Sequence, residues 1–132
     1  MEDFNLDRFI EAQDHLTIYG PSAYDQAMKE IANGGLRIHC WIRYLYPQMK
    51  GLGTSKVTNF YGVNGREEAK AYLNHPVLRK RLINICELLL NNERTVYEIF
   101  EQDAMRIRSC VLLFASVSDI PVFHQLKAKY QW

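Results

Sequence analysis

Apolar residues recur at helical spacing along most of the chain. In the segment that begins at Ser22 they fall at positions i, i+3, i+4 and i+7, which places them on one side of a helix; they are Tyr24, Ala27, Met28 and Ile31. The segment from Pro76 to about Asn91 carries a longer stripe, made of Leu78, Leu82, Ile85, Cys86 and Leu89. We expect this second helix to lie at the centre of the fold, because apolar residues cover most of its girth.

Polar residues at the starts of these stripes mark the predicted helix ends. Asn5 is expected to cap a first helix that runs from about Leu6 to about His15, with Phe4 and Phe9 as its hydrophobic staple. Three further pairs have the spacing of N-terminal capping residues, namely Ser22 with Asp25, Asn64 with Glu67, and Thr95 with Glu98. The last two pairs predict helices that end near Asn74 and Phe100.

The remaining segments also favour helices. Residues 38–46 read as a short helix rather than a strand, which Pro47 ends, and residues 55–61 add one or two helical turns. Residues 104–117 follow helical spacing behind a cap at Asp103, although the apolar run 110–115 is also compatible with a buried strand. A last helix opens at Pro121, with Val122, Phe123, Leu126 and Tyr130 facing inward.

Length and composition then decide the fold class. The chain has 132 residues, of which 48% are hydrophobic and 23% charged, as in an ordinary folded protein. Two domains would each be too small to bury a competent core. We therefore predict an all-α fold, a compact single-domain bundle of about seven helices, several of them short, over residues 1–132.

Charge and cysteine usage limit the partners and the compartment. The formal net charge of +1 argues against a dedicated binder of duplex nucleic acid or of an anionic membrane. Two acidic residues follow Met1, no apolar signal region comes after them, and the longest apolar run is far too short to cross a bilayer. Cys40, Cys86 and Cys110 form no CxxC pair, which fits reduced thiols and predicts a cytoplasmic protein.

Motifs for catalysis and cofactors are mostly absent from the sequence. It contains no GxSxG, HExxH, GxxxxGK[ST] or GxGxxG, so no cofactor is predicted. Its histidines are scattered, and His39-Cys40 alone offers too few ligands for zinc, so no metal site is predicted. The basic clusters at residues 79–81 and 106–108 suit single-stranded nucleic acid only if aromatic side chains lie beside them; we expect the arginines instead to cover the core and pair with acids.

Four stretches of the chain resemble one known family. They are residues 5–13, residues 41–55 with Tyr46-Pro47-Gln48 and Gly51-Leu52-Gly53, residues 68–82 with His75-Pro76, and residues 103–114 with Asp103 and Arg106. In this order they resemble the mainly bacterial, uncharacterised family catalogued as domain of unknown function 1810, over nearly the whole chain. The resemblance implies a mainly helical fold. Some members are labelled calpastatin, a flexible inhibitor that does not suit this packed composition.

The resemblance also bears on activity. The family pattern has a histidine before its first tryptophan and a second tryptophan two residues after it, whereas this chain has Cys40 and Arg43 there. An activity that needs that histidine would here depend on His39. Family members resemble partners of macrodomains in fused proteins, which implies ADP-ribose or NAD-derived chemistry by association.

These observations lead to two hypotheses about function. In the first, a pocket binds or processes a nucleotide-like or ADP-ribose-like ligand, because polar and aromatic motif residues fall at helix ends and loops; the binding residues would be Trp41, Tyr44, Gln48 and Tyr72. An enzyme of this kind would use His75 for proton transfer, Arg106 as anion clamp and Asp103 as orienting carboxylate, although His75 and Asp103 also suit helix caps. In the second, an aromatic surface near Trp41 and Tyr46 docks a protein partner or a second copy in a homodimer.

Overall fold

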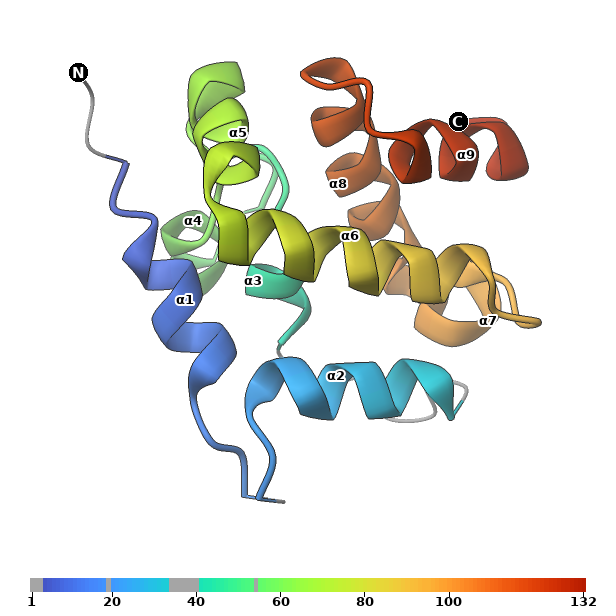
Figure 1. The fold of residues 1–132 in the computed structure, drawn as a ribbon, viewed down its shortest axis with the longest axis horizontal. Coiled ribbons are helices and arrows are strands. Elements are labelled where there is room, and N and C mark those ends of the chain that lie inside the picture. Colours follow the sequence, from blue (N-terminus) through green and yellow to red (C-terminus); the bar gives the residue numbers. More distant parts are fainter. Residues whose placement is uncertain (1–3, 19, 34–40, 54) are drawn as a thin grey trace.

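The computed structural model describes residues 4–18, 20–33, 41–53 and 55–132, and within them the fold is all-α, as predicted. Figure 1 shows the arrangement of the helices. Their bounds are α1 Asp7–Asp14, α2 Ala23–Ala32, α3 Ile42–Leu45, α4 Lys56–Phe60, α5 Gly65–Asn74, α6 Pro76–Leu90, α7 Val96–Phe100, α8 Ala104–Ser116 and α9 Pro121–Tyr130, with a 3₁₀ turn η1 at Glu101–Asp103. The predicted alternative of a strand at 110–115 is wrong, because this run lies inside α8.

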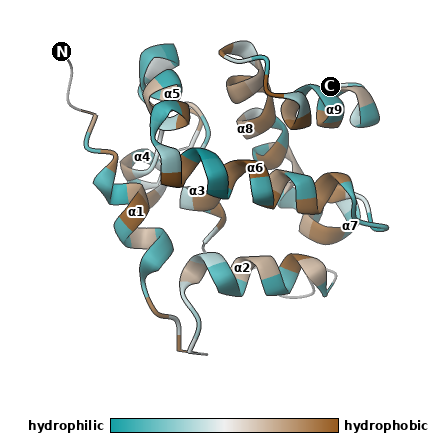
Figure 2. Cartoon of the chain, viewed as in Figure 1, coloured by the Kyte–Doolittle hydropathy of each residue, from teal (hydrophilic) through white to brown (hydrophobic). Residues whose placement is uncertain are grey.

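Helix α6 lies in the middle of the molecule, as its apolar girth predicts. It runs between α2 and α9 in Figure 1 and also packs against α1 and α5. The five residues of its predicted stripe, Leu78, Leu82, Ile85, Cys86 and Leu89, are all buried. Hydrophobic and hydrophilic residues alternate around the helices in Figure 2, which is typical of elements that pack through one side.

Two of the predicted capping pairs form as expected. The Ser22 hydroxyl accepts a hydrogen bond from the Asp25 amide at 3.2 Å. Thr95 and Glu98 form a reciprocal capping box, with bonds of 3.1 Å and 3.0 Å between each side chain and the other residue's amide. Both pairs are local in sequence, and a local pattern is sufficient to predict them.

The predicted cap at Asn5 is wrong, whereas Asn64 is the N-cap residue of α5, as predicted, without the expected side-chain bond. The N-cap of α1 is Leu6, and Asn5 has a left-handed backbone with φ of 52°, which asparagine tolerates. Asn64 does precede α5, but its side chain makes no capping bond; its backbone amide donates to Glu68 Oε1 at 2.6 Å, whereas the expected partner Glu67 is exposed. At both helix starts the backbone bonds instead to the Arg8–Glu68 ion pair described below. Arg8 contacts the Phe4 and Asn5 carbonyls before α1, and Glu68 accepts from the Asn64 amide before α5.

The loop after α3 is held against the turn before α5 by two backbone hydrogen bonds. The Lys50 amide donates to the Val63 carbonyl at 2.8 Å, and the Val63 amide donates to the Gln48 carbonyl at 2.9 Å. Gly62 lies against this loop, since a Cβ atom at this position would be 2.7 Å from the Lys50 Cα. Among the described residues, no helix has the length and apolar character needed to span a bilayer.

Candidate functional site

Two of the predicted ligand-binding aromatics lie in the core. Trp41 is 2% exposed, and its indole Nε1 donates to Glu30 Oε1 at 3.0 Å. Tyr72 is fully buried, with its ring edge against Phe9 and its hydroxyl accepting from Gln13 Nε2 at 3.3 Å. Burial raises the pKa of the Tyr72 phenol far above its ordinary value. Both rings therefore fill the protein interior, and neither is placed to cover a ligand at the surface.

The other two predicted binding residues lie at the edge of the core. The half-buried Tyr44 packs its ring against Tyr61, with centroids 5.1 Å apart, and its carbonyl accepts from Gln13. Gln48 is 8% exposed, and its carbonyl is part of the backbone pairing with Val63. Gln48 thus lies in a loop that is held by backbone hydrogen bonds.

His75 and Asp103, predicted as proton-transfer and orienting groups, both stand at helix starts. His75 is the N-cap of α6, where its Nδ1 accepts from the Leu78 amide at 3.4 Å. Asp103 is exposed at the N-cap position of α8, where its side chain makes no capping bond. His75 thus fits the capping interpretation, whereas the Asp103 carboxylate faces another predicted residue, Arg106.

The charge of a second arginine, Arg43 of α3, acts on Arg106. Burial lowers the pKa of the half-buried Arg106 guanidinium, and the like charge of Arg43 lowers that pKa further; the Asp103 carboxylate opposes both effects. Arg43 Nε donates to Thr58 Oγ1 at 3.3 Å, and Thr58 Oγ1 also accepts from the Ser55 hydroxyl at 2.8 Å. Of the predicted site residues, Asp103 and Arg106 are thus coupled through their charges, and the charge of Arg43 acts on Arg106 as well.

The glycine motif after Gln48 explains how Thr58 is held at this place. Thr58 is 7% exposed and belongs to α4. A Cβ atom at Gly53 would lie 2.2 Å from Thr58 Cγ2, so only glycine lets the loop pass this close to the threonine. The loop therefore fixes the hydroxyl to which Arg43 is anchored.

Arg106 differs from Arg81 and Arg66 in that its guanidinium bonds to no acceptor among the residues that the structure describes. Arg81 pairs with Asp14 at 2.6 Å and Arg66 donates to the Ser116 carbonyl at 2.9 Å. Within the described part of the chain, the Arg106 guanidinium has neither a hydrogen bond nor an ion pair within 4.0 Å. The charges of Arg43 and Arg106, opposed by the single carboxylate of Asp103, leave a net positive charge around Arg106.

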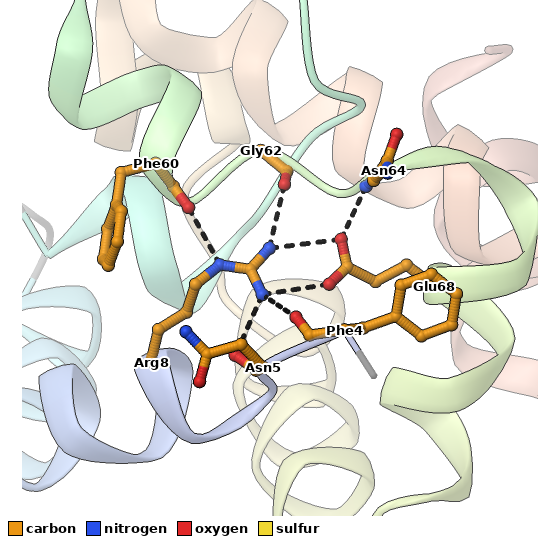
Figure 3. Close-up of polar contacts among 7 residues, drawn as sticks. All are labelled: Phe4, Asn5, Arg8, Phe60, Gly62, Asn64 and Glu68. Carbon is orange, nitrogen blue, oxygen red and sulfur yellow. Dashed lines mark hydrogen bonds and ion pairs between the residues drawn. The ribbon is translucent and has the colours of Figure 1, made fainter. Parts of the chain in front are cut away.

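A second polar site surrounds Arg8 and is shown in Figure 3. Arg8 pairs with Glu68 through two bonds of 2.9 Å and 3.1 Å, and Glu68 also accepts from the Asn64 amide. The other guanidinium donors reach backbone carbonyls on both sides of the pair; these belong to Phe4, Asn5, Phe60 and Gly62. The side chains of Arg8 and Glu68 are 9% and 1% exposed.

All five guanidinium N–H groups of Arg8 thus have an acceptor, because Nε, Nη1 and Nη2 contact six acceptor oxygens in total. The bonds join the chain start, α1, the α4–α5 turn and α5. This arrangement is a structural clamp, and it offers no N–H to an incoming anion.

Comparison with known proteins gives the family. A family model described as a protein of unknown function (DUF1810) matches residues 3–131. The chain belongs to this family. Its fold is similar to that of the crystal structure of the conserved hypothetical protein Rv1873 from Mycobacterium tuberculosis, with 34% identity and a TM-score of 0.87 over 98% of this chain and 89% of that one. No curated protein matches the chain.

Three residues of this DUF1810 chain were missed as site residues by the sequence reasoning. Glu68 carries a detectable signal, since it lies four residues before Tyr72 on the inward side of its helix, where an acid needs a buried partner. Arg43 stands where the family pattern has a tryptophan, and this departure is its signal. Arg8 has none, because nothing local indicates that its side chain reaches a helix 60 positions away.

Proposed function

We propose that this DUF1810 protein binds a small ligand that carries phosphate, of the nucleotide or ADP-ribose type, between Arg43 and Arg106. The observation that carries the proposal is the half-buried Arg106 guanidinium, which bonds to no acceptor in the described part of the chain and on which the like charge of Arg43 acts. Two like charges in a partly desolvated place repel each other, and a bound anion would relieve that repulsion.

Phosphate fits these two side chains better than other common anions do. Guanidinium groups match the geometry of phosphate oxygens and bond to them in pairs, with charge assistance. The Ser55 and Thr58 hydroxyls lie beside Arg43 and add neutral groups that accept or donate hydrogen bonds. The resemblance to partners of macrodomains supports a diphosphate ligand such as ADP-ribose over a single phosphate.

The proposal is limited to binding and contains no catalytic step. His75 uses its Nδ1 as a helix cap, and no described contact connects it with Arg106. The Asp103 carboxylate stands near Arg106 and would exclude ligands that bring a further negative charge to its side of the site. Trp41 and Tyr72 lie in the core and have no role in this binding proposal.

A calorimetric titration with ADP-ribose, AMP and pyrophosphate tests this proposal. We expect Arg106→Gln and Arg43→Gln each to weaken binding by about ten- to a hundredfold, the effect of losing a hydrogen bond from a charged group. Arg79→Gln is the matched control, because Arg79 is an exposed arginine of α6 and its replacement changes the net charge equally. We expect this control to bind as the wild type does.

Two outcomes contradict the proposal. One is a wild-type protein that binds none of the three compounds at millimolar concentration. The other is an Arg106→Gln variant that binds them as tightly as Arg79→Gln does. Rising salt concentration should weaken binding to the wild type, because the interaction is between opposite charges.

The alternative function, an interaction module with an aromatic surface, is less well supported. The proposed surface was centred on Trp41 and Tyr46, and both rings are buried. Tyr46 is fully enclosed, and its hydroxyl donates to the Ile85 carbonyl at 3.1 Å. These aromatics therefore cannot form an exposed docking patch in the folded protein.

A further inference from the structure

A cavity of about 300 Å³ opens over the Arg8–Glu68 clamp. Its base is the clamp itself, and its walls come from three separate stretches of the chain, represented by Phe4, Lys50 and Phe60. Both charged side chains of the base are more than nine-tenths buried and hold each other in place. The base is thus rigid before any ligand arrives, which reduces the entropic cost of binding.

Arg8 can line this cavity only with one flat face of its guanidinium group. Its N–H groups point along the plane of the guanidinium toward the partners drawn around its rim in Figure 3. One face of that plane lies over the Phe9 ring, with Cζ 4.3 Å from the ring centroid. Since Arg8 lines the cavity, it does so through its other face.

This geometry excludes one class of ligand and favours another. An anion would find no N–H group of Arg8 available and would meet a charge that Glu68 already balances. A planar ring, in contrast, gains from stacking on a guanidinium face without needing its donors. Asn59 and Asn64 line the same cavity, and their amides carry both the donor and the acceptor that the edge of a heterocycle requires.

We propose that the cavity over Arg8 binds an uncharged planar heteroaromatic ring, such as a nucleobase, stacked on the open face of the guanidinium. The phenyl groups of Phe4 and Phe60 form apolar walls beside the ring. The volume is at the lower end of that of ligand pockets, which suits one base or nucleoside. This site is separate from Arg43 and Arg106, and its ligand needs no phosphate.

A titration of the ¹⁵N-labelled full chain with adenosine, followed by NMR, tests the site. The Arg8 Nε–H group donates to the Phe60 carbonyl at 2.8 Å and lies in the plane on which the base stacks. We expect its resonance to move upfield as adenosine is added, together with shifts of the Phe60, Gly62 and Asn64 amides. Ribose, which has no ring to stack, should leave the Arg8 resonance in place.

Two variants on α4 form a matched pair. Phe60 and Val57 are 54% and 50% exposed, but only Phe60 lines the cavity. Phe60→Ala should bind adenosine about tenfold more weakly, in the range found when an aromatic contact to a base is removed, and Val57→Ala should bind it as the wild type does. An unshifted Arg8 resonance in ligand-free Phe60→Ala confirms that the clamp is intact.

Three results would overturn this inference. They are an Arg8 resonance that does not move with millimolar adenosine, an equal shift with ribose, and equal weakening by Phe60→Ala and Val57→Ala. The phosphate site is tested independently, because pyrophosphate has no ring to stack and should leave the Arg8 resonance in place. Failure of one proposal therefore does not imply failure of the other.

Discussion

At the scale of single residues, Arg8 and Arg106 differ in how their charged side chains are paired. Arg8 is paired with a buried carboxylate and has an acceptor for every N–H group. Arg106 is half-buried next to Arg43 and bonds to none of the described residues. A saturated charge contributes to the fold, whereas an unsaturated one costs stability, and for Arg106 we propose that this cost serves ligand binding.

Glu68→Gln should destabilise the protein strongly. The change leaves the Arg8 charge buried without its counter-charge, and breaking a buried pair in this way costs about 3 kcal/mol or more. The neighbouring Glu67→Gln is the control, because Glu67 is exposed; its cost should stay within about 0.5 kcal/mol. Urea unfolding measures both, and equal losses in the two variants would show that the clamp contributes nothing specific.

Arg106→Gln should behave in the opposite way. Removing a partly desolvated charge that faces a like charge should leave the free energy of unfolding unchanged or raise it, even though ligand binding is lost. Arg8→Gln should lower the free energy of unfolding, since the change leaves the Glu68 carboxylate buried and unpaired. Thermal unfolding without ligand compares the two variants, and a large loss in Arg106→Gln would make this residue structural.

At the scale of elements, short-range patterns predict helices well, and long-range contacts correct their ends. The capping box at Thr95 and Glu98 forms as its spacing predicts, because both partners lie within one turn. Asn5 does not cap α1, since the Arg8 guanidinium draws the preceding carbonyls toward the α4–α5 turn. A cap is therefore predictable only where no distant side chain competes for the same backbone groups.

Gly62→Ala tests the pairing of the loop after α3 with the turn before α5. The new methyl group would approach the Lys50 backbone within 2.7 Å and must push the two segments apart. We expect a loss of about 1–3 kcal/mol in urea unfolding, the usual cost of overpacking. Lys50→Ala, which shortens an exposed side chain, should be nearly neutral. Full stability in Gly62→Ala would mean that this contact relaxes freely.

At the scale of the whole molecule, one hydrophobic core joins the helices and also encloses ionisable groups. Burial raises the pKa of the Cys86 and Cys110 thiols well above their ordinary value. Both thiols lie in the core, on the central α6 and on α8. They act there as small apolar residues, and they should not react with thiol reagents in the native state.

Because the two thiols are buried, the free energy of unfolding should fall as the pH becomes alkaline. The unfolded chain releases their protons above about pH 8.5, whereas the folded chain keeps them, so the unfolded state is favoured as the pH rises. Their contribution is fully present below about pH 8.5 and is lost as the pH rises toward their folded pKa. Urea midpoints at neutral and alkaline pH measure this effect. Cys86→Ala with Cys110→Ala should flatten the decline, and an unchanged decline would contradict the assignment.

The sequence by itself determined the helices and the core of this protein, because helical period and local caps act within a few residues of one another. It also indicated Arg106 and Asp103 as neighbours, since they are one helical turn apart. Only the tertiary structure decided that Trp41 and Tyr72 are buried, that the charge of Arg43 acts on Arg106, and that Arg8 reaches Glu68. These contacts join segments far apart in the chain, and no local pattern encodes the distance between two side chains that meet only when the core is packed.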